Sequence, residues 1–300
     1  MKPRRTWYVG SFFAFISAAL FALGDAAVRL TASQVTVWHM MFARCLVGLL
    51  AVSAIAGTMR LPILGRNRVA MIFTGIVNVG GGMCMMIALT LLPLFDAIVL
   101  LYLYPAFAAF FSPYLARDPI DGIDWLLIGV AFAGTTLVLW SGHASHALQW
   151  GHLVGVGTPV FQGLAFTLIR RYSIDHHALT PFFYFCLIGT LGSLWPLSVQ
   201  PKPFNISAAG ILGLLAIVVL AGVGQVIMYK ALAYIPSPDA GIISMTEVIF
   251  GGLLGYVIFS EALSGRAFIG ALLIVGSGVG LNLKNRRENQ VATEKPPMIA

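Results

Sequence analysis

Residues 88–97 read Ala-Leu-Thr-Leu-Leu-Pro-Leu-Phe-Asp-Ala, and residues 231–240 read Ala-Leu-Ala-Tyr-Ile-Pro-Ser-Pro-Asp-Ala. Ala, Leu, Pro, Asp and Ala therefore recur at an offset of 143 residues. The same offset pairs Asp118 with Glu261, and an offset of 141 aligns Phe, Cys, Leu and Gly of residues 42–48 with those of residues 183–189. These matches indicate that one structural unit occurs twice in the chain.

Long apolar runs extend outward from these two stretches and cover most of the chain. Hydrophobic residues make up 59% of the 300 positions, charged residues only 10%, and the mean hydropathy is +0.89. A soluble globule carries about 25% charged residues, so this composition excludes one and predicts an integral membrane protein. The runs are continuous rather than alternating, which favours helices over a barrel. The predicted spans are 7–28, 35–56, 69–91, 95–115, 123–141, 152–171, 180–198, 208–231, 238–259 and 266–283.

Ten spans in two copies predict an all-α membrane fold of two five-helix repeats, at residues 7–141 and 152–283. Because five is odd, the second copy must enter the membrane from the opposite side, so the repeats are expected to be inverted. Secondary transporters often use this arrangement and bind substrate near the membrane midplane, between the repeats. Residues 284–300 are polar, and we expect them to form a disordered cytoplasmic tail.

The charge distribution predicts an orientation. Thirteen Lys and Arg residues fall on one predicted side of the membrane and three on the other, while Arg44 and Lys230 lie within spans. The positive-inside rule makes the richer side, which holds both termini, cytoplasmic. The net charge of +7 therefore reflects topology, and we expect the lipid bilayer rather than nucleic acid as a partner.

Two segments complete a recognisable pattern: Arg44 and Pro105 in spans two and four, and Ser-Met-Thr-Glu-Val-Ile-Phe at 244–250 followed by Ser260-Glu261. With ten spans and the repeat, the chain resembles the EamA family of the drug/metabolite transporter superfamily over roughly residues 10–283. The chain departs from the family pattern at a few positions. Proline is replaced by Val248, glycine by Ser260, and Gly-Glu in the first half by Arg117-Asp118.

The resemblance implies a secondary transporter of the bacterial inner membrane that exports amino acids, related metabolites or amphipathic compounds. Spans one, three, four, six, eight and nine would line its central cavity. The substrate gradient or proton exchange would supply the energy, so protons are a candidate partner beside a small-molecule substrate.

Other readings of the sequence remain open. One rival is a multidrug or lipophilic-cation exporter of the same fold, and another is an intramembrane enzyme or scaffold. The sequence holds no ATP-binding glycine loop, hydrolase motif or metal-ligand spacing. We therefore expect no cofactor, no metal and no enzymatic activity, in a monomer or weak homodimer.

Two charged residues inside spans are candidate substrate-binding residues. Glu247 lies near the middle of span nine, where a carboxylate is costly and a functional role is the default hypothesis. It is expected either to carry a coupling proton or to hydrogen-bond a neighbouring helix. Arg44 is expected either to hold a substrate carboxylate in a bidentate contact or to bind helix carbonyls.

Uncharged polar and aromatic residues give further candidates. Asn78 and Gln225 occupy equivalent faces of spans three and eight, and Gln162 lies beside Pro159 in span six. Each amide is expected to bind substrate or to join helices. The tyrosines that could form an aromatic site, or simply pack, are Tyr102, Tyr104 and Tyr229.

Three aspartates have simpler predicted roles. Asp96 and Asp239 each follow a proline turn and are predicted to cap helix N-termini. Asp25 and Arg29, four residues apart, are predicted to form a helical ion pair at the outer end of span one.

Overall fold

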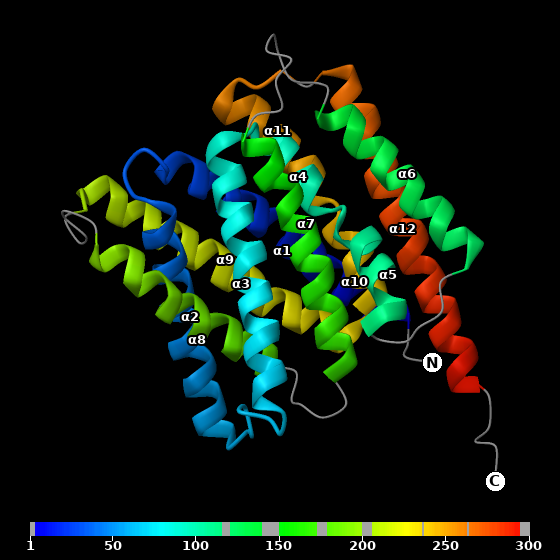
Figure 1. Cartoon of the computed structure of the whole chain (residues 1–300), viewed down its shortest axis with the longest axis horizontal. Coiled ribbons are helices and arrows are strands. Elements are labelled where there is room, and N and C mark those ends of the chain that lie inside the picture. Colours follow the sequence, from blue (N-terminus) through cyan, green and yellow to red (C-terminus); the bar gives the residue numbers. More distant parts are fainter. Residues whose placement is uncertain are drawn as a thin grey trace.

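The computed structural model describes residues 4–115, 121–139, 150–172, 179–199, 206–235, 237–262 and 264–294. All regular structure in these ranges is α-helical (Figure 1). The helices are α1 Arg4–Thr31, α2 Val37–Met59, α3 Arg68–Leu91, α4 Leu94–Leu101, α5 Tyr104–Leu115, α6 Gly122–Leu139, α7 Trp150–Tyr172, α8 Thr180–Ser198, α9 Ala208–Tyr234, α10 Ser237–Ser244, α11 Glu247–Phe259 and α12 Gly265–Glu294.

The helices account for every predicted span. Eight segments are long and apolar enough to cross a membrane, and two of these are formed by helix pairs, α4 with α5 and α10 with α11. Two shorter apolar helices, Gly122–Val138 within α6 and Gly265–Leu281 within α12, correspond to predicted spans five and ten. Ten membrane-crossing segments are therefore compatible with this all-α fold.

Spans four and nine are each interrupted in the middle. The first pair breaks at Tyr102 and Leu103, the second at Met245 and Thr246. Both breaks are bridged by backbone hydrogen bonds to the third preceding residue, as in Leu103 N to Leu100 O and Thr246 N to Ile243 O. These tighter bonds mark a local departure from α-helical geometry.

The two breaks have different local causes. Pro105, in the first turn of α5, has no N–H, and its ring would clash with the carbonyl of residue 101 if the helix continued. Span nine has Val248 at the corresponding position. There the hydroxyls of Ser244 and Thr246 donate to the carbonyls of Ala240 and Ile243, a local bonding pattern that competes with and bends a helix.

Helix packing joins the two halves reciprocally. α1 packs on α9 and α7 on α3, which are corresponding pairs of the two copies. α2 packs on its own counterpart α8, and α6 on its counterpart α12, as Figure 1 shows for both pairs. A contact between the copies therefore recurs with their roles exchanged, the pattern that a two-fold relation generates.

The α2–α8 crossing shows this reciprocity atom by atom. The sulfur of Cys186 would lie 2.7 Å from a β-carbon at Gly48, and the sulfur of Cys45 occupies the same place over Gly189. Both cysteines are fully buried. Each glycine therefore makes room for the thiol of the opposite helix, and an alanine at either position would force the helices apart.

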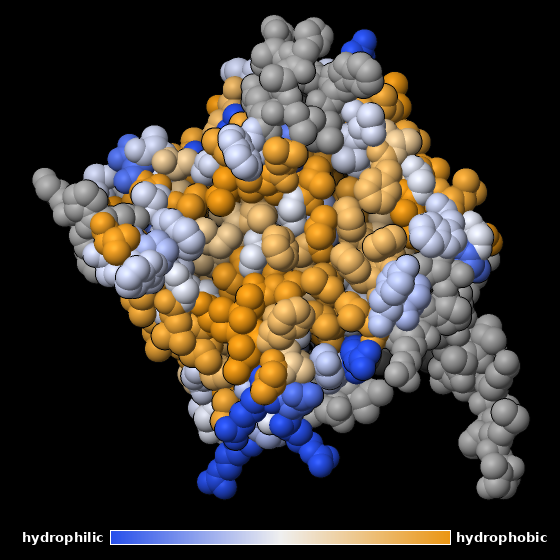
Figure 2. All heavy atoms as spheres, viewed as in Figure 1, coloured by the Kyte–Doolittle hydropathy of each residue, from blue (hydrophilic) through white to orange (hydrophobic). Residues whose placement is uncertain are grey.

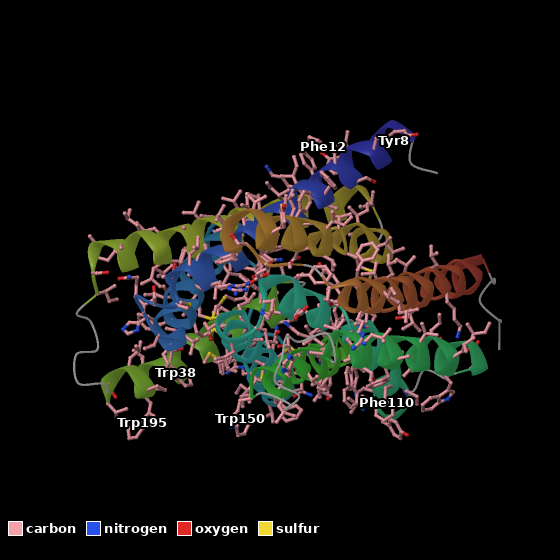
Figure 3. The ribbon with its side chains drawn as sticks, turned by 90° about the horizontal axis from the view of Figure 1, so that it is seen from above. Tyr8, Phe12, Trp38, Phe110, Trp150 and Trp195 are labelled. Carbon is pink, nitrogen blue, oxygen red and sulfur yellow. The ribbon has the colours of Figure 1, made fainter. Side chains whose placement is uncertain are left out.

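The outer surface is suited to lipid. Figure 2 shows a broad apolar face with hydrophilic side chains gathered mainly along its margins. Large apolar side chains point away from the bundle, among them Phe110, Trp150 and Trp195 in Figure 3, and Trp195 is 74% exposed. Burial of this surface in a bilayer is the arrangement that the composition predicts.

The helix at the C-terminal end is longer than predicted. α12 continues to Glu294, so residues 284–294 are helical and not the disordered tail expected from their polarity. Lys284 pairs with Asp121 (2.7 Å) and Asp124 (2.5 Å) at the start of α6, which ties this part of α12 to the bundle. The hydrogen bond from Lys284 lowers the pKa of Asp121.

Candidate functional site

Glu247 lies at the break of span nine and is 4% exposed. The hydroxyl of Tyr102, at the break of span four, donates to Glu247 Oε2 (2.8 Å) and to the Ser244 carbonyl oxygen (2.6 Å). Tyr102 itself is buried. One tyrosine from the first half thus joins both helical segments of span nine, and the two interrupted spans meet at their breaks.

Asp25 of α1 brings a second carboxyl group to Glu247. A side-chain hydrogen bond joins the two acids. An ionised carboxylate can only accept hydrogen bonds, so this contact requires a proton on one of the pair. The site therefore holds two carboxyl groups and at least one exchangeable proton.

Arg44 of α2 supplies the positive charge of the site. It is half-buried, and it acts electrostatically on both Asp25 and Glu247. Within the described ranges its guanidinium makes no hydrogen bond to either acid. Its donors are therefore not committed to the acid pair.

Tyr104 adds an aromatic side to this cluster. Its ring centroid lies 6.3 Å from that of Tyr102 and 5.0 Å from that of Phe166 on α7. The neighbouring α5 rings continue this aromatic region, with Phe107 and Phe111 stacked at 6.3 Å. The arrangement places charged groups and aromatic rings side by side.

A model of the EamA-like transporter family matches the chain twice, at residues 8–140 and 149–283. This chain belongs to the EamA-like transporter family. The expected recognition is thereby confirmed, and with it a multi-pass membrane protein of a transporter family.

Several proteins are similar to this EamA-family transporter along most of their length. The pseudopaline exporter CntI of Pseudomonas aeruginosa is 24% identical over 277 residues, which cover 91% of this chain and 95% of the exporter. Solute carrier family 35 member G1 of Homo sapiens is 22% identical and covers 92% of this chain, with 79% of its own length matched. A solved crystal structure shares the fold, with a TM-score of 0.61 at 18% identity over 95% of this chain and 99% of that one.

The amide candidates lie apart from the acid pair's hydrogen bonds. Asn78 and Gln225 are half-buried on α3 and α9, and neither hydrogen-bonds to the acid pair in the described ranges. Gln162 packs its side chain against Gly81 at the α3–α7 interface. The side chain of Tyr229 lies outside what the structure describes. The substrate-binding roles of these four residues stay predictions.

Two aspartate predictions are corrected. Arg29 does not pair with Asp25 but with Glu261, which follows α11, because Asp25 is engaged by Glu247. Asp96 is in the first turn of α4 as expected, yet it makes no capping hydrogen bond. Glu261 takes that place by accepting from the Leu94 N–H at 2.9 Å. The side chain of Asp239 lies outside the described part of the chain.

Sequence reasoning missed the role of Asp25. Its spacing to Arg29 satisfied the rule for a local ion pair, which concealed a partner more than two hundred positions away. The available signal was the carboxyl group within an apolar span, since intramembrane acids are functional candidates by default. No metal site is formed by His, Cys, Asp or Glu in the described ranges.

Proposed function

We propose that this chain is a secondary transporter that exports small organic solutes, such as amino acids or related metabolites, by alternating access. The observation that carries the proposal is the Asp25–Glu247 pair at the meeting point of two interrupted spans. Interrupted helices at the membrane centre are typical of substrate and ion sites in secondary transporters. Buried acids there are costly and persist where they serve a substrate or proton pathway.

The chemistry of the site supports a zwitterionic substrate. A substrate ammonium group would replace the proton shared by Asp25 and Glu247, and Arg44 would bind a carboxylate. The rings of Tyr104 and Phe166 would contact an apolar or aromatic portion of the solute. Glu247 would carry the coupling proton when the substrate has left.

The reciprocal helix packing supports two inverted five-helix repeats, at 7–141 and 152–283, as the basis of alternating access. Two similar halves that exchange conformations would open the site to each side of the membrane in turn. We also propose both termini in the cytoplasm of a bacterial inner membrane, on the strength of the Lys and Arg distribution.

A lipophilic-cation exporter of the same fold is a second candidate. Two carboxyl groups beside several aromatic rings would suit a cation that has no carboxylate. In that case Arg44 would hinder rather than help binding. Replacement of Arg44 by Gln should then preserve or increase dye efflux, whereas it should abolish export of a zwitterion.

One comparison tests the proposal. Cells expressing the wild-type chain, the Glu247→Gln variant or no transporter are grown alike, and their external metabolites are compared without preselection. The proposal predicts that one or a few solutes with both amino and carboxylate groups accumulate outside wild-type cells only. Export of lipophilic dyes without any such solute would select the second candidate.

A further inference from the structure

Glu261 joins two parts of the chain that are far apart in sequence. Its carboxylate accepts hydrogen bonds from the Leu94 N–H, at 2.9 Å through Oε2 and 3.3 Å through Oε1, and from the Phe95 N–H. These are free donors at the N-terminus of α4, where a negative charge is favoured. A residue after α11 therefore caps a helix of the other half.

Arg29 closes the same contact from a third element. It forms an ion pair with Glu261, and its guanidinium lies 4.5 Å from the ring centre of Phe259. Both charged side chains are largely buried. Charge-assisted hydrogen bonds in such surroundings are stronger than those at an open surface.

The three elements that meet here also carry the acid site at their other ends. Asp25 lies one turn before Arg29 on α1, and Tyr102 follows the last residue of the eight-residue α4. Glu247 begins α11, which ends just before Glu261. A movement that separates these elements at Glu261 must therefore be felt at the acid site, about 12 Å away along α4.

We propose that Glu261 and Arg29 form a latch that holds one end of the substrate path closed. In the closed state Glu261 caps α4 and pairs with Arg29. In the open state α1 and α4 separate from the end of α11, and the site becomes accessible from that side. The inference rests on the alternating-access part of the proposed function, but its test needs no substrate.

The test measures how often the closed end opens. Ala97, one turn into α4 and 1% exposed, is replaced by cysteine as a reporter in the purified full-length protein. N-ethylmaleimide alkylation is then followed for each cysteine by mass spectrometry. The buried native Cys45 and Cys186, at the α2–α8 crossing, report on general unfolding in the same sample.

The variants separate the cap from the ion pair. Glu261→Gln and Arg29→Gln remove the ion pair but leave an oxygen for the Leu94 N–H, and each should accelerate reporter alkylation about tenfold, the effect expected of one charge-assisted bond. Glu261→Ala removes both contacts and should give the largest acceleration. Adding Arg29→Gln to Glu261→Ala should change nothing more, because the partner is already absent.

Lys284→Gln is the matched control, since it removes a comparable ion pair that joins only α6 and α12. The latch predicts no acceleration in this variant and unreactive Cys45 and Cys186 throughout. Unchanged reporter rates in Glu261→Ala would overturn the proposal. Equal acceleration by Lys284→Gln, or parallel exposure of Cys45 and Cys186, would also overturn it by showing general loosening. Absence of any export would instead contradict the proposed function and leave these rates unaffected.

Discussion

Two corresponding contacts at the centre of the bundle have opposite chemistry. At the break of span nine, Glu247 meets Asp25 of α1. At the break of span four, the equivalent position holds Tyr104, which contacts Phe166 of α7 with ring centres 5.0 Å apart. Offsets of 143 and 141 residues relate Tyr104 to Glu247 and Asp25 to Phe166.

The correspondence extends to the backbone and to neighbouring contacts. α4 and α10 have the same length, and α5 and α11 begin 143 residues apart. A β-carbon at Gly10 would meet Tyr234 and Ile235, and one at Gly151 would meet Leu91 and Leu92. The helix arrangement is therefore shared by the two halves, whereas acidic groups have been placed in only one of the two central contacts.

We interpret the difference as a division of labour within one site. The carboxyl contact binds protons and positive charge, and the aromatic contact supplies apolar surface without a titratable group at neutral pH. If both contacts served only to pack helices, exchanging their chemistry would cost little more than local repacking. The following substitutions separate these two cases.

Removing the charge of Asp25 should have the largest effect. Asp25→Asn retains the size of the side chain and its hydrogen bond to Glu247, but it cannot bind or release a proton. We expect export to fall by roughly 10- to 100-fold, the range expected for loss of a charged hydrogen-bonding partner. Export of the solute from expressing cells provides the measurement, and Phe166→Leu is the matched control at the equivalent position. Equal losses in both variants would remove the distinction.

Tyr102 and Tyr104 should differ in how much their hydroxyl groups stabilise the fold. Tyr102→Phe leaves the Ser244 carbonyl and a buried Glu247 oxygen without their donor, which should lower the free energy of unfolding by about 1–3 kcal/mol. Tyr104→Phe deletes a hydroxyl that forms no hydrogen bond to the Glu247 carboxyl and should cost less. Denaturant unfolding of both variants in the same detergent would compare them, and a larger cost at Tyr104 would contradict this assignment.

The proline difference between the breaks should matter least. Span nine is interrupted with Val248 in place of proline, so Pro105→Ala should leave the break of span four in place. We expect a change in stability of no more than about 1 kcal/mol, since alanine restores one N–H and relaxes one ring. Distances between spin labels on α4 and α5 would detect straightening, and a continuous helix in this variant would make Pro105 the cause of the break.

Sequence patterns predicted the spans much better than the site. Hydropathy located all ten apolar segments because lipid imposes one dominant requirement on each of them. The helix breaks were not predicted, since an interruption of two residues leaves the hydropathy of a span unchanged. Pro105 offered a local signal for one of them, but nothing comparable marks Met245.

The pairing of charges required three-dimensional information. Glu247, Tyr102, Tyr104 and Arg44 were selected because polar or aromatic groups in a span are conspicuous. Their partners could not be chosen from spacing, because Asp25 and Arg29 satisfy the local ion-pair rule and yet bond to Glu247 and Glu261. Local rules fail here because contacts between helices outweigh a pair worth a few tenths of a kcal/mol, about 0.2–0.5.

Proteoliposomes with an imposed pH gradient test the central claim most directly, with the solute identified from expressing cells as the substrate. Glu247→Gln keeps the shape of the protonated side chain and an oxygen for the Tyr102 hydroxyl, but it cannot titrate. We predict that this variant folds normally and exchanges internal for external solute, yet no longer accumulates solute when a pH gradient is applied. Accumulation equal to that of the wild-type protein would contradict a coupling role for Glu247 and would direct attention to Asn78 and Gln225.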